Sequence, residues 1–338
     1  MIKSMYSGIS GMNAQQKKLD VIGNNIANSG TTAFKSSSVT FQDTMRETIG
    51  KGSGPVLALG GSNPKQIGMG VQLQSINVNT GQGSMNPTGR PLDNAIDGEG
   101  SYFMVAKGEV GADKGNIKVD PATGLVTGGD MEVYFTRDGE FKRDSSGSLV
   151  TPDGYRVMGY SIVGGDITYG QPNKVNFVDA NKSDAPVTAD EDKGLVPLII
   201  PETVTTGDGE KRVVGFTIEK DGLIKATLEN GEVAAIGQIG MASFVNDSAL
   251  TAEGGNKYTP SANSGSATVR PGKNTNVTER KDAEKAYGDI INGMLEMSNV
   301  DLAVEFTEMI VASRSFQACS KVITTGDEIL QELVNLKR

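Results

Sequence analysis

The sequence contains no histidine, no tryptophan and a single cysteine, Cys319. Histidine is the commonest general base and the commonest metal ligand in proteins, so its absence argues against an enzyme, although carboxylate and lysine chemistry remain open. A lone cysteine excludes an intramolecular disulfide framework and a cysteine-based structural zinc site. We therefore predict no catalytic, cofactor or metal site.

Long apolar runs and basic clusters are also missing. No stretch of 18 apolar residues occurs, so no segment is expected to span a membrane. The first ten residues, MIKSMYSGIS, lack the continuous apolar core of a Sec signal peptide. The formal net charge is −9, which argues against a nucleic-acid partner. The protein is expected to stay in the cytoplasm or to leave the cell by another route.

Glycine, by contrast, is abundant. The chain of 338 residues has 44 glycines, most of them at turn-like positions, which favours many short strands. The length is sufficient for two or three modest domains.

The N-terminal segment has the apolar period of a coiled coil. Apolar residues recur at alternating steps of three and four, and the pattern is interrupted at Gln16 and Gly23. This pattern predicts a helix of about 26 residues that is marginal alone in water. The expected assembly stripe consists of Ile2, Met5, Ile9, Met12, Leu19 and Ile26.

The C-terminal segment repeats apolar residues every seven positions. Such a period implies a left-handed supercoil with a partner, although docking on the core of its own domain is the alternative. Ser298 and Asp301 have the spacing of a capping box, which predicts a helix from about Asn299 to Leu336. The expected stripe consists of Leu302, Met309, Phe316, Ile323 and Leu330, with Phe306 and Leu333 beside it.

Between the two ends the apolar period changes to two. In GFTIEKDGLIKATL, a three-residue loop ending at Gly222 would pair Ile218 with Ile224. The same rule opposes Phe135 to Phe141 in a second hairpin. The sequence thus predicts a β-rich middle.

The segment 163–212 is polar and acidic and then apolar, so we interpret it as a small inserted β domain. The predicted fold class is α+β: a terminal α-helical coiled-coil domain carries a β-rich body with this insertion. The expected boundaries are 1–71 and 283–338 for the helical domain with its linker, 72–162 and 213–282 for the body, and 163–212 for the insertion.

The remaining motif-like segments provide no chemistry. GGSNPKQIGMG, at 60–70, lacks the Gly-Lys-Ser/Thr end of a phosphate-binding loop. The acidic run at 190–192 lacks the spacing of a calcium-binding loop. Cys319 lies in the C-terminal stripe, where a buried, inert thiol is expected.

Two long terminal segments carry a family resemblance. LDVIGNNIANSGTTAFK (19–35) and SNVDLAVEFTEMIVASRSFQACSKVITTGDEILQELVNLKR (298–338) resemble bacterial flagellar axial proteins of the hook and rod group. Within that group, TGRPLDNAIDGEGSYFMV (88–105) and the segments 135–160 and 236–258 are most similar to hook proteins. The N-terminal family motif falls on Asn24, Asn25, Asn28, Phe34 and Lys35, with Ala33 where the family usually has glycine.

The resemblance implies a structural protein. In that family the terminal helices form the inner wall of a tube, and an Asn-rich turn joins the first helix to an extended stretch leading to the β domain. The implied function is a hook subunit that assembles with copies of itself into a curved tube, a universal joint transmitting torque. The implied partners are rod and hook–filament junction proteins, the hook cap and the type III export apparatus, and the implied location is the extracellular flagellum. The terminal helices are expected to be largely disordered in the monomer.

Two alternatives remain open at this stage. A distal rod subunit would form a straight, rigid tube from the same kind of helices. An adhesin or carbohydrate-binding β protein would use its helical ends only to dimerise.

Overall fold

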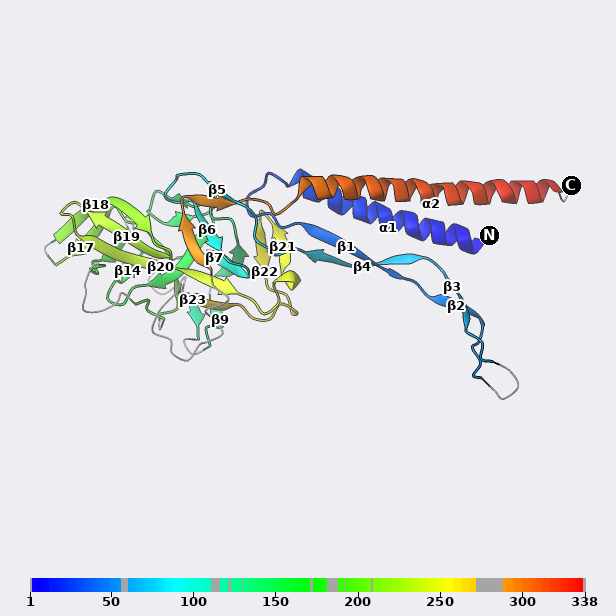
Figure 1. Cartoon of the computed structure of the whole chain (residues 1–338). Helices are drawn as coiled ribbons and strands as arrows, with labels where there is room; N and C mark the ends of the chain where they lie inside the picture. Colours follow the sequence, from blue (N-terminus) through cyan, green and yellow to red (C-terminus); the bar gives the residue numbers. More distant parts are fainter. Residues whose placement is uncertain are drawn as a thin grey trace. The chain divides into compact units, whose positions relative to one another are not determined.

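The computed structural model describes residues 2–55, 60–110, 116–120, 123–129, 131–170, 173–180, 188–191, 193–207, 209–271 and 288–336. The chain forms two compact units (Figure 1). Unit 1 consists of Met1–Gly30, Lys35–Asn79 and Val300–Arg338, and unit 2 of Thr31–Phe34 and Thr80–Asn299. Unit 1 holds the long helices and unit 2 is β-rich, so the predicted α+β class is confirmed.

Unit 1 is built on two helices, α1 (Ile2–Ala27) and α2 (Leu302–Leu336). The two helices lie side by side and run antiparallel, so that the N-terminus and the C-terminus of the chain lie at the same end of the pair (Figure 1). Strand β1 (Ser37–Asp43) pairs with β4 (Val71–Val78), and both pack against α1. Strands β2 (Arg46–Gly50) and β3 (Lys65–Gly68) form a separate two-stranded ribbon.

Helix α2 begins three residues later than predicted. Asp301 caps it, because its Oδ1 accepts the backbone N–H groups of Ala303 and Val304 at 2.9 and 3.3 Å. Ser298, which was expected to form a capping box with Asp301, lies in unit 2 and is buried there. The capping-box prediction is therefore corrected to a single Asp cap.

The described part of unit 2 contains a network of seventeen paired strands and two further strand pairs. β7 supplies buried side chains to two cores, with Phe103 and Val105 in one and Tyr102 and Met104 in the other. Because both of its faces are covered, β7 carries an unbroken apolar run. The strands are β5 (Met85–Pro87), β6 (Asn94–Asp97), β7 (Ser101–Lys107), β8 (Ile117–Val119), β9 (Val126–Gly129), β10 (Glu132–Thr136), β11 (Lys142–Arg143), β12 (Leu149–Val150), β13 (Arg156–Ser161), β14 (Ile167–Thr168), β15 (Lys174–Asn176), β16 (Leu195–Pro197), β17 (Thr203–Thr206), β18 (Gly209–Ile218), β19 (Leu223–Leu228), β20 (Val233–Ser243), β21 (Thr251–Gly254), β22 (Lys257–Thr259), β23 (Thr268–Pro271), β24 (Asp289–Asn292) and β25 (Met294–Glu296), with a short 3-10 turn η1 (Asp247–Ala249).

One predicted hairpin is confirmed and the other is wrong. Ile218 pairs with Ile224 across β18 and β19, and Gly222 has a φ of +79° in the loop. Phe135, however, pairs with Met104 of β7 and Tyr258 of β22, not with Phe141. Since β10 has a neighbour on each side, no edge is left for the strand after the turn.

The predicted insertion at 163–212 does not separate from the body. β14, β15 and β17 extend the sheet beyond β18, whereas β16 pairs with β13 and β8 inside it. Leu195 lies in one core of the body, and Leu198 and Ile200 lie in the other. The apolar half of the segment thus belongs to the body itself.

The predicted boundary between helical and β-rich parts also shifts. β4 continues the helical unit to Asn79, and β24 and β25, which were assigned to the terminal domain, pair with β6 and β5 in unit 2. The end of the predicted body segment 213–282 contains β22 and β23, and its residues from 272 on lie outside the described residues.

Candidate assembly site

The helix pair of unit 1 meets along small residues. Ala14 of α1 and Ala312 of α2 are buried, as are Gly8 and Gly11. A Cβ added at Gly11 would lie 2.9 Å from Cys319 Sγ, and one added at Gly8 would lie 3.2 Å from Ile323 Cγ1. Glycine therefore lets the two helices approach closely at these positions.

The predicted stripes meet this seam only in part. On α2, Met309, Phe316, Ile323 and Leu330 are half-buried, whereas Leu302, Phe306 and Leu333 are 42–51% exposed. On α1, Met5, Met12, Leu19 and Ile26 are half-buried and Ile9 is 44% exposed; the side chain of Ile2 lies outside the described residues. The predicted stripes contained only large apolar residues, so the prediction missed Gly8 and Gly11.

Unit 1 leaves much apolar surface uncovered. Apolar side chains exposed in such number on one unit indicate contact with a partner. Besides the predicted positions, the exposed large apolar residues of unit 1 include Tyr6 on α1; Val304, Ile310, Val311, Val322, Ile329, Val334 and Leu336 on α2; and Met45, Ile49, Ile67, Met69, Leu73 and Ile76 on or beside the strands.

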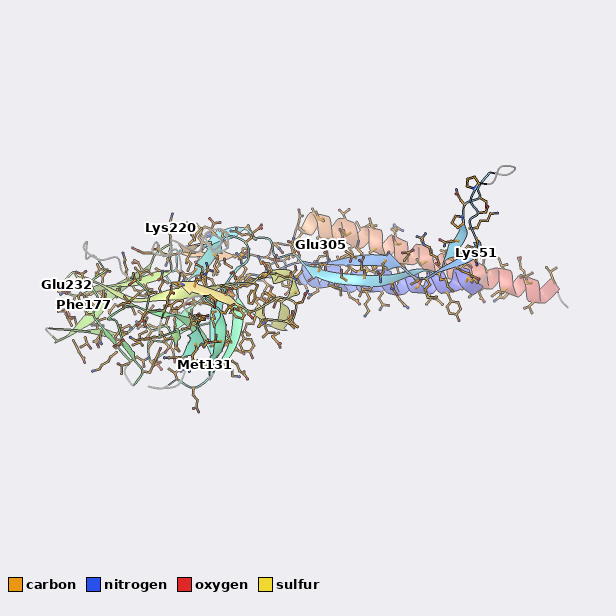
Figure 2. The ribbon with its side chains drawn as sticks, turned by 90° about the horizontal axis from the view of Figure 1, so that it is seen from below. Lys51, Met131, Phe177, Lys220, Glu232 and Glu305 are labelled. Atoms are coloured by element: carbon orange, nitrogen blue, oxygen red, sulfur yellow. The ribbon has the colours of Figure 1, made fainter. Side chains whose placement is uncertain are left out.

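The three motif asparagines have different roles at the end of α1. Asn28 closes the helix, because its Nδ2 donates to the carbonyl and side-chain oxygens of Asn24, each at 2.9 Å. Asn25 is buried, with 1% of its surface exposed. Its Nδ2 donates to Ser37 O at 2.8 Å and to Glu305 Oε1 at 2.9 Å, and its Oδ1 accepts from Ser37 N at 3.0 Å. Asn25 thus connects α1 with β1 and with the first turn of α2, where Figure 2 labels Glu305.

The motif residues Ala33, Phe34 and Lys35 follow in the chain. Ala33 is buried with a φ of +55°, a left-handed conformation that glycine adopts most easily. Phe34 is half-buried and its carbonyl accepts from Asn299 N at 3.3 Å, while Lys35 is 4% exposed. The backbone geometry gives a physical reason for the glycine that the family resemblance places at position 33.

A buried ion pair ties together segments of unit 2 that are distant in sequence. Arg137 Nε donates to Glu296 Oε2 at 2.8 Å, and neither side chain is exposed. Glu296 also accepts from Gly83 N through Oε1 and from Ala33 N through its carbonyl, both at 2.8 Å. We call Ala33, Gly83, Arg137 and Glu296 the Glu296 tie. In the sequence, the only sign of this ion pair is an arginine next to an apolar strand.

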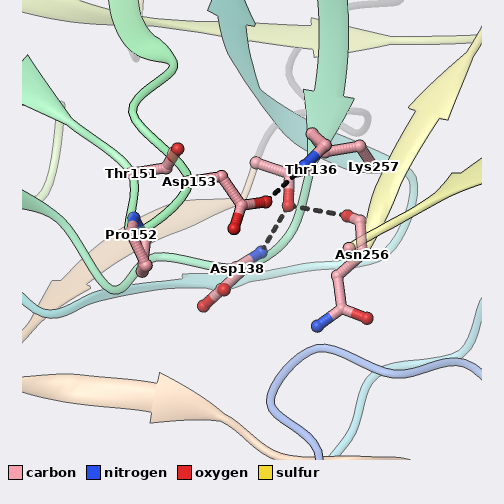
Figure 3. A pocket seen from close by; sticks show the side chains of 8 residues that line it. Thr136, Asp138, Thr151, Pro152, Asp153, Asn256 and Lys257 are labelled. Atoms are coloured by element: carbon pink, nitrogen blue, oxygen red, sulfur yellow. Dashed lines mark hydrogen bonds and ion pairs between the residues drawn. The ribbon is translucent and has the colours of Figure 1, made fainter.

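A small cavity of about 150 Å³ lies at the end of β10, next to Arg137 in the sequence (Figure 3). The polar residues that line the cavity interact with one another. Thr136 Oγ1 donates to Asn256 O at 2.8 Å and accepts from Asp138 N at 3.0 Å. Lys257 forms an ion pair with Asp153. Burial raises the pKa of the Asp138 carboxyl. No nucleophile there faces a base, so the cavity has no evident chemistry.

Comparison with known proteins identifies the family. Three family models match: "Flagella basal body rod protein" at residues 5–35, "Flagellar hook protein FlgE/F/G D1 domain" at 125–226 and "Flagellar basal body rod FlgEFG protein C-terminal" at 291–336. The flagellar basal-body rod protein FlgG of Bacillus subtilis (strain 168) is 39% identical over the full length of both chains. The chain belongs to the flagellar hook and rod protein family.

Other members of the hook and rod family are similar over comparable lengths. The flagellar hook protein FlgE of Borreliella burgdorferi is 28% identical, with all of both chains covered. The rod protein FlgG of Caulobacter vibrioides is 30% identical, covering 99% of this chain and all of the relative. The family is a structural component of the flagellar hook and basal body, so the adhesin and carbohydrate-binding alternatives fall away. No helix among the described residues is both long and apolar enough to cross a membrane.

Proposed function

We propose that the chain is the structural subunit of a flagellar hook, which polymerises into a curved tube and transmits torque as a universal joint. The observation that carries this proposal is the uncovered apolar surface of unit 1, on both helices and on the strands beside them. Such surface is costly in a free subunit and becomes favourable when neighbouring subunits bury it.

Repeated head-to-tail contacts that do not close on themselves build a helical tube. Exposed residues on α2, among them Val304, Val311 and Ile329, would meet neighbouring copies, and the predicted stripe residues Leu302, Phe306 and Leu333 would join them. Ile9, a predicted stripe residue of α1, is also exposed and would meet neighbouring copies.

The surface of unit 2 suits a joint that bends. Its strands and loops carry exposed ion pairs, including Lys174–Glu210 and Lys193–Asp166. Exposed pairs of this kind contribute about 0–1 kcal/mol each, so contacts made through them would be remade easily as subunits slide. The outer strands β14, β15 and β17 supply additional polar surface of this sort.

A distal rod subunit is the second candidate. The 39% identity to a relative named as a basal-body rod protein favours it. In either role we propose export by the flagellar type III route to a site outside the cytoplasm. The rod, the hook–filament junction proteins, the hook cap and the export apparatus would be its partners, and copies of itself its main contact.

Deletion of the gene in the source bacterium separates the two candidates. Electron microscopy of isolated basal bodies should show a complete rod without a hook if the chain is the hook subunit. A missing or shortened rod would favour the rod subunit instead. Normal flagella would contradict both proposals, and restoration by the unaltered gene is the control.

A further inference from the structure

The packing of α1 against α2 leaves the register of the pair undetermined. The bulky row of α2 repeats every seven residues at Met309, Phe316, Ile323 and Leu330. The small row does the same at Ala312, Cys319 and Gly326. A slip of α1 by seven residues would move Gly11 from Cys319 to Ala312 or to Gly326, and either is small enough to admit the close approach. Apolar packing therefore does not distinguish one heptad register from the next.

The polar end of the seam does distinguish them. The row that contains Ala312 and Cys319 begins at Glu305, a carboxylate, and the facing residue of α1 is Asn25. A slip in one direction would place Asn25 opposite Ala312, which offers no acceptor, and a slip in the other would move it past the start of α2. Lys18 and Glu308, 3.2 Å apart, support the same register.

We propose that Asn25 is the residue that sets the register of the terminal helix pair, with Glu305 as its partner. Its amide is also held by both backbone groups of Ser37, so β1 fixes the orientation of the Asn25 side chain that faces α2. A buried polar residue in an otherwise apolar seam is the best-attested way to fix helix register. The proposal concerns unit 1 alone and holds for a hook and a rod subunit alike.

Disulfide trapping measures the register directly. The Cβ position at Gly11 is 2.9 Å from Cys319 Sγ, close to the spacing within a disulfide, so Gly11→Cys should form a bond with Cys319 in the native register. A second substitution, Ala312→Cys or Gly326→Cys, gives the thiol at position 11 an alternative disulfide partner one heptad before or after Cys319. Adding Lys321→Cys, on the exposed side of α2, offers a competitor that no register of the paired helices can reach.

The register variants are Asn25→Asp, which is isosteric but cannot donate, and Glu305→Ala. Glu305→Gln is the matched control, because its side-chain oxygen still accepts from Asn25 Nδ2. Each full-length variant is co-expressed with the unaltered chain, so that an assembly defect does not remove the sample. Flagellar structures are then isolated, oxidised mildly, and the disulfides are mapped by mass spectrometry.

We expect Asn25→Asp and Glu305→Ala to raise the ratio of slipped to native disulfides about tenfold, the change that loss of one hydrogen bond to a charged acceptor gives. Glu305→Gln should keep the parent ratio, and position 321 should stay unlinked throughout. An unchanged ratio in both register variants would overturn the proposal. Linkage at position 321 in those variants would also overturn it, because Asn25 would then hold the helices together without choosing their register.

Discussion

The Glu296 tie makes a quantitative prediction about unit 2. Arg137→Met removes the guanidinium but keeps an unbranched side chain of similar length. Glu296 then remains fully buried beside a methionine, and the carbonyls of Ile96 and Gly98, which accept from Arg137 Nη2 at 3.2 and 2.6 Å, lose a donor.

The size of the effect follows from burial. Removing one partner of a buried ion pair costs about 3–5 kcal/mol, because the remaining charge stays in a low-dielectric environment without its counter-charge. For a unit of this size each kcal/mol shifts the unfolding midpoint by about 2–4 °C, so we expect the midpoint of unit 2 to fall by about 6–20 °C. Only Tyr6, among the described tyrosines, lies outside unit 2, so near-ultraviolet circular dichroism of the full-length chain follows this unit.

Two further variants make the test specific. Lys174→Met breaks an exposed ion pair with Glu210 and should cost less than about 1 kcal/mol. Arg137→Met combined with Glu296→Leu removes both charges, so it should be more stable than Arg137→Met alone. If Arg137→Met costs no more than Lys174→Met, or if the double variant is as unstable as the sum of its single changes, the tie does not hold unit 2 together.

Three other predictions concern single positions. Ala33→Gly should stabilise the full-length chain by about 1 kcal/mol in urea unfolding, because glycine adopts the φ of +55° without strain, and a destabilised variant would contradict this. Asp138→Asn should raise the thermal midpoint at pH 7. Burial raises the pKa of this carboxyl, so the folded chain holds its proton more tightly, and stability is lost as pH rises through the folded pKa; below the ordinary value of 3.8 the two proteins should be equally stable. Gly11→Leu should abolish polymerisation, measured by sedimentation, because the branched end of leucine has no room in a seam where even its Cβ would lie 2.9 Å from Cys319 Sγ and, unlike a cysteine, it cannot bond to that sulfur. Gly23→Ala, with open space around it, should polymerise normally and serves as the control.

The helices were predictable because their periods are strong and local. The seven-residue row of α2 follows from the sequence alone, as does the end of α1 at the asparagines. The seam itself was not predictable, because Gly8 and Gly11 carry no hydrophobic signal and their role depends on Cys319 and Ile323, more than 300 residues away. Sequence periodicity identifies the apolar side of a helix, but not which small residues make closest contact.

In the β-rich unit, too, features set by neighbouring residues were predictable and features set by distant residues were not. The β18–β19 register followed from a local loop, and its prediction was correct. The hairpin expected at Phe135 failed because β7 and β22 already occupy both edges of β10, and they come from distant parts of the chain. The pairing of Arg137 with Glu296 could not be read from either residue alone, since a charged residue is normally expected at the surface.

The strand pairs next to the Glu296 tie determine when unit 2 can finish folding. β6 pairs with β24 and β5 with β25, so each pairing closes a loop of about 200 residues. Closing such a loop costs roughly 5 kcal/mol of chain entropy before any contact is made. A chain that emerges N-terminus first therefore holds Arg137 without its carboxylate, and β5 and β6 without their partner strands, until residues 289–296 arrive. Long-range closure of this kind slows folding, and under the proposed export this delay would give a subunit time to reach its place before it becomes compact.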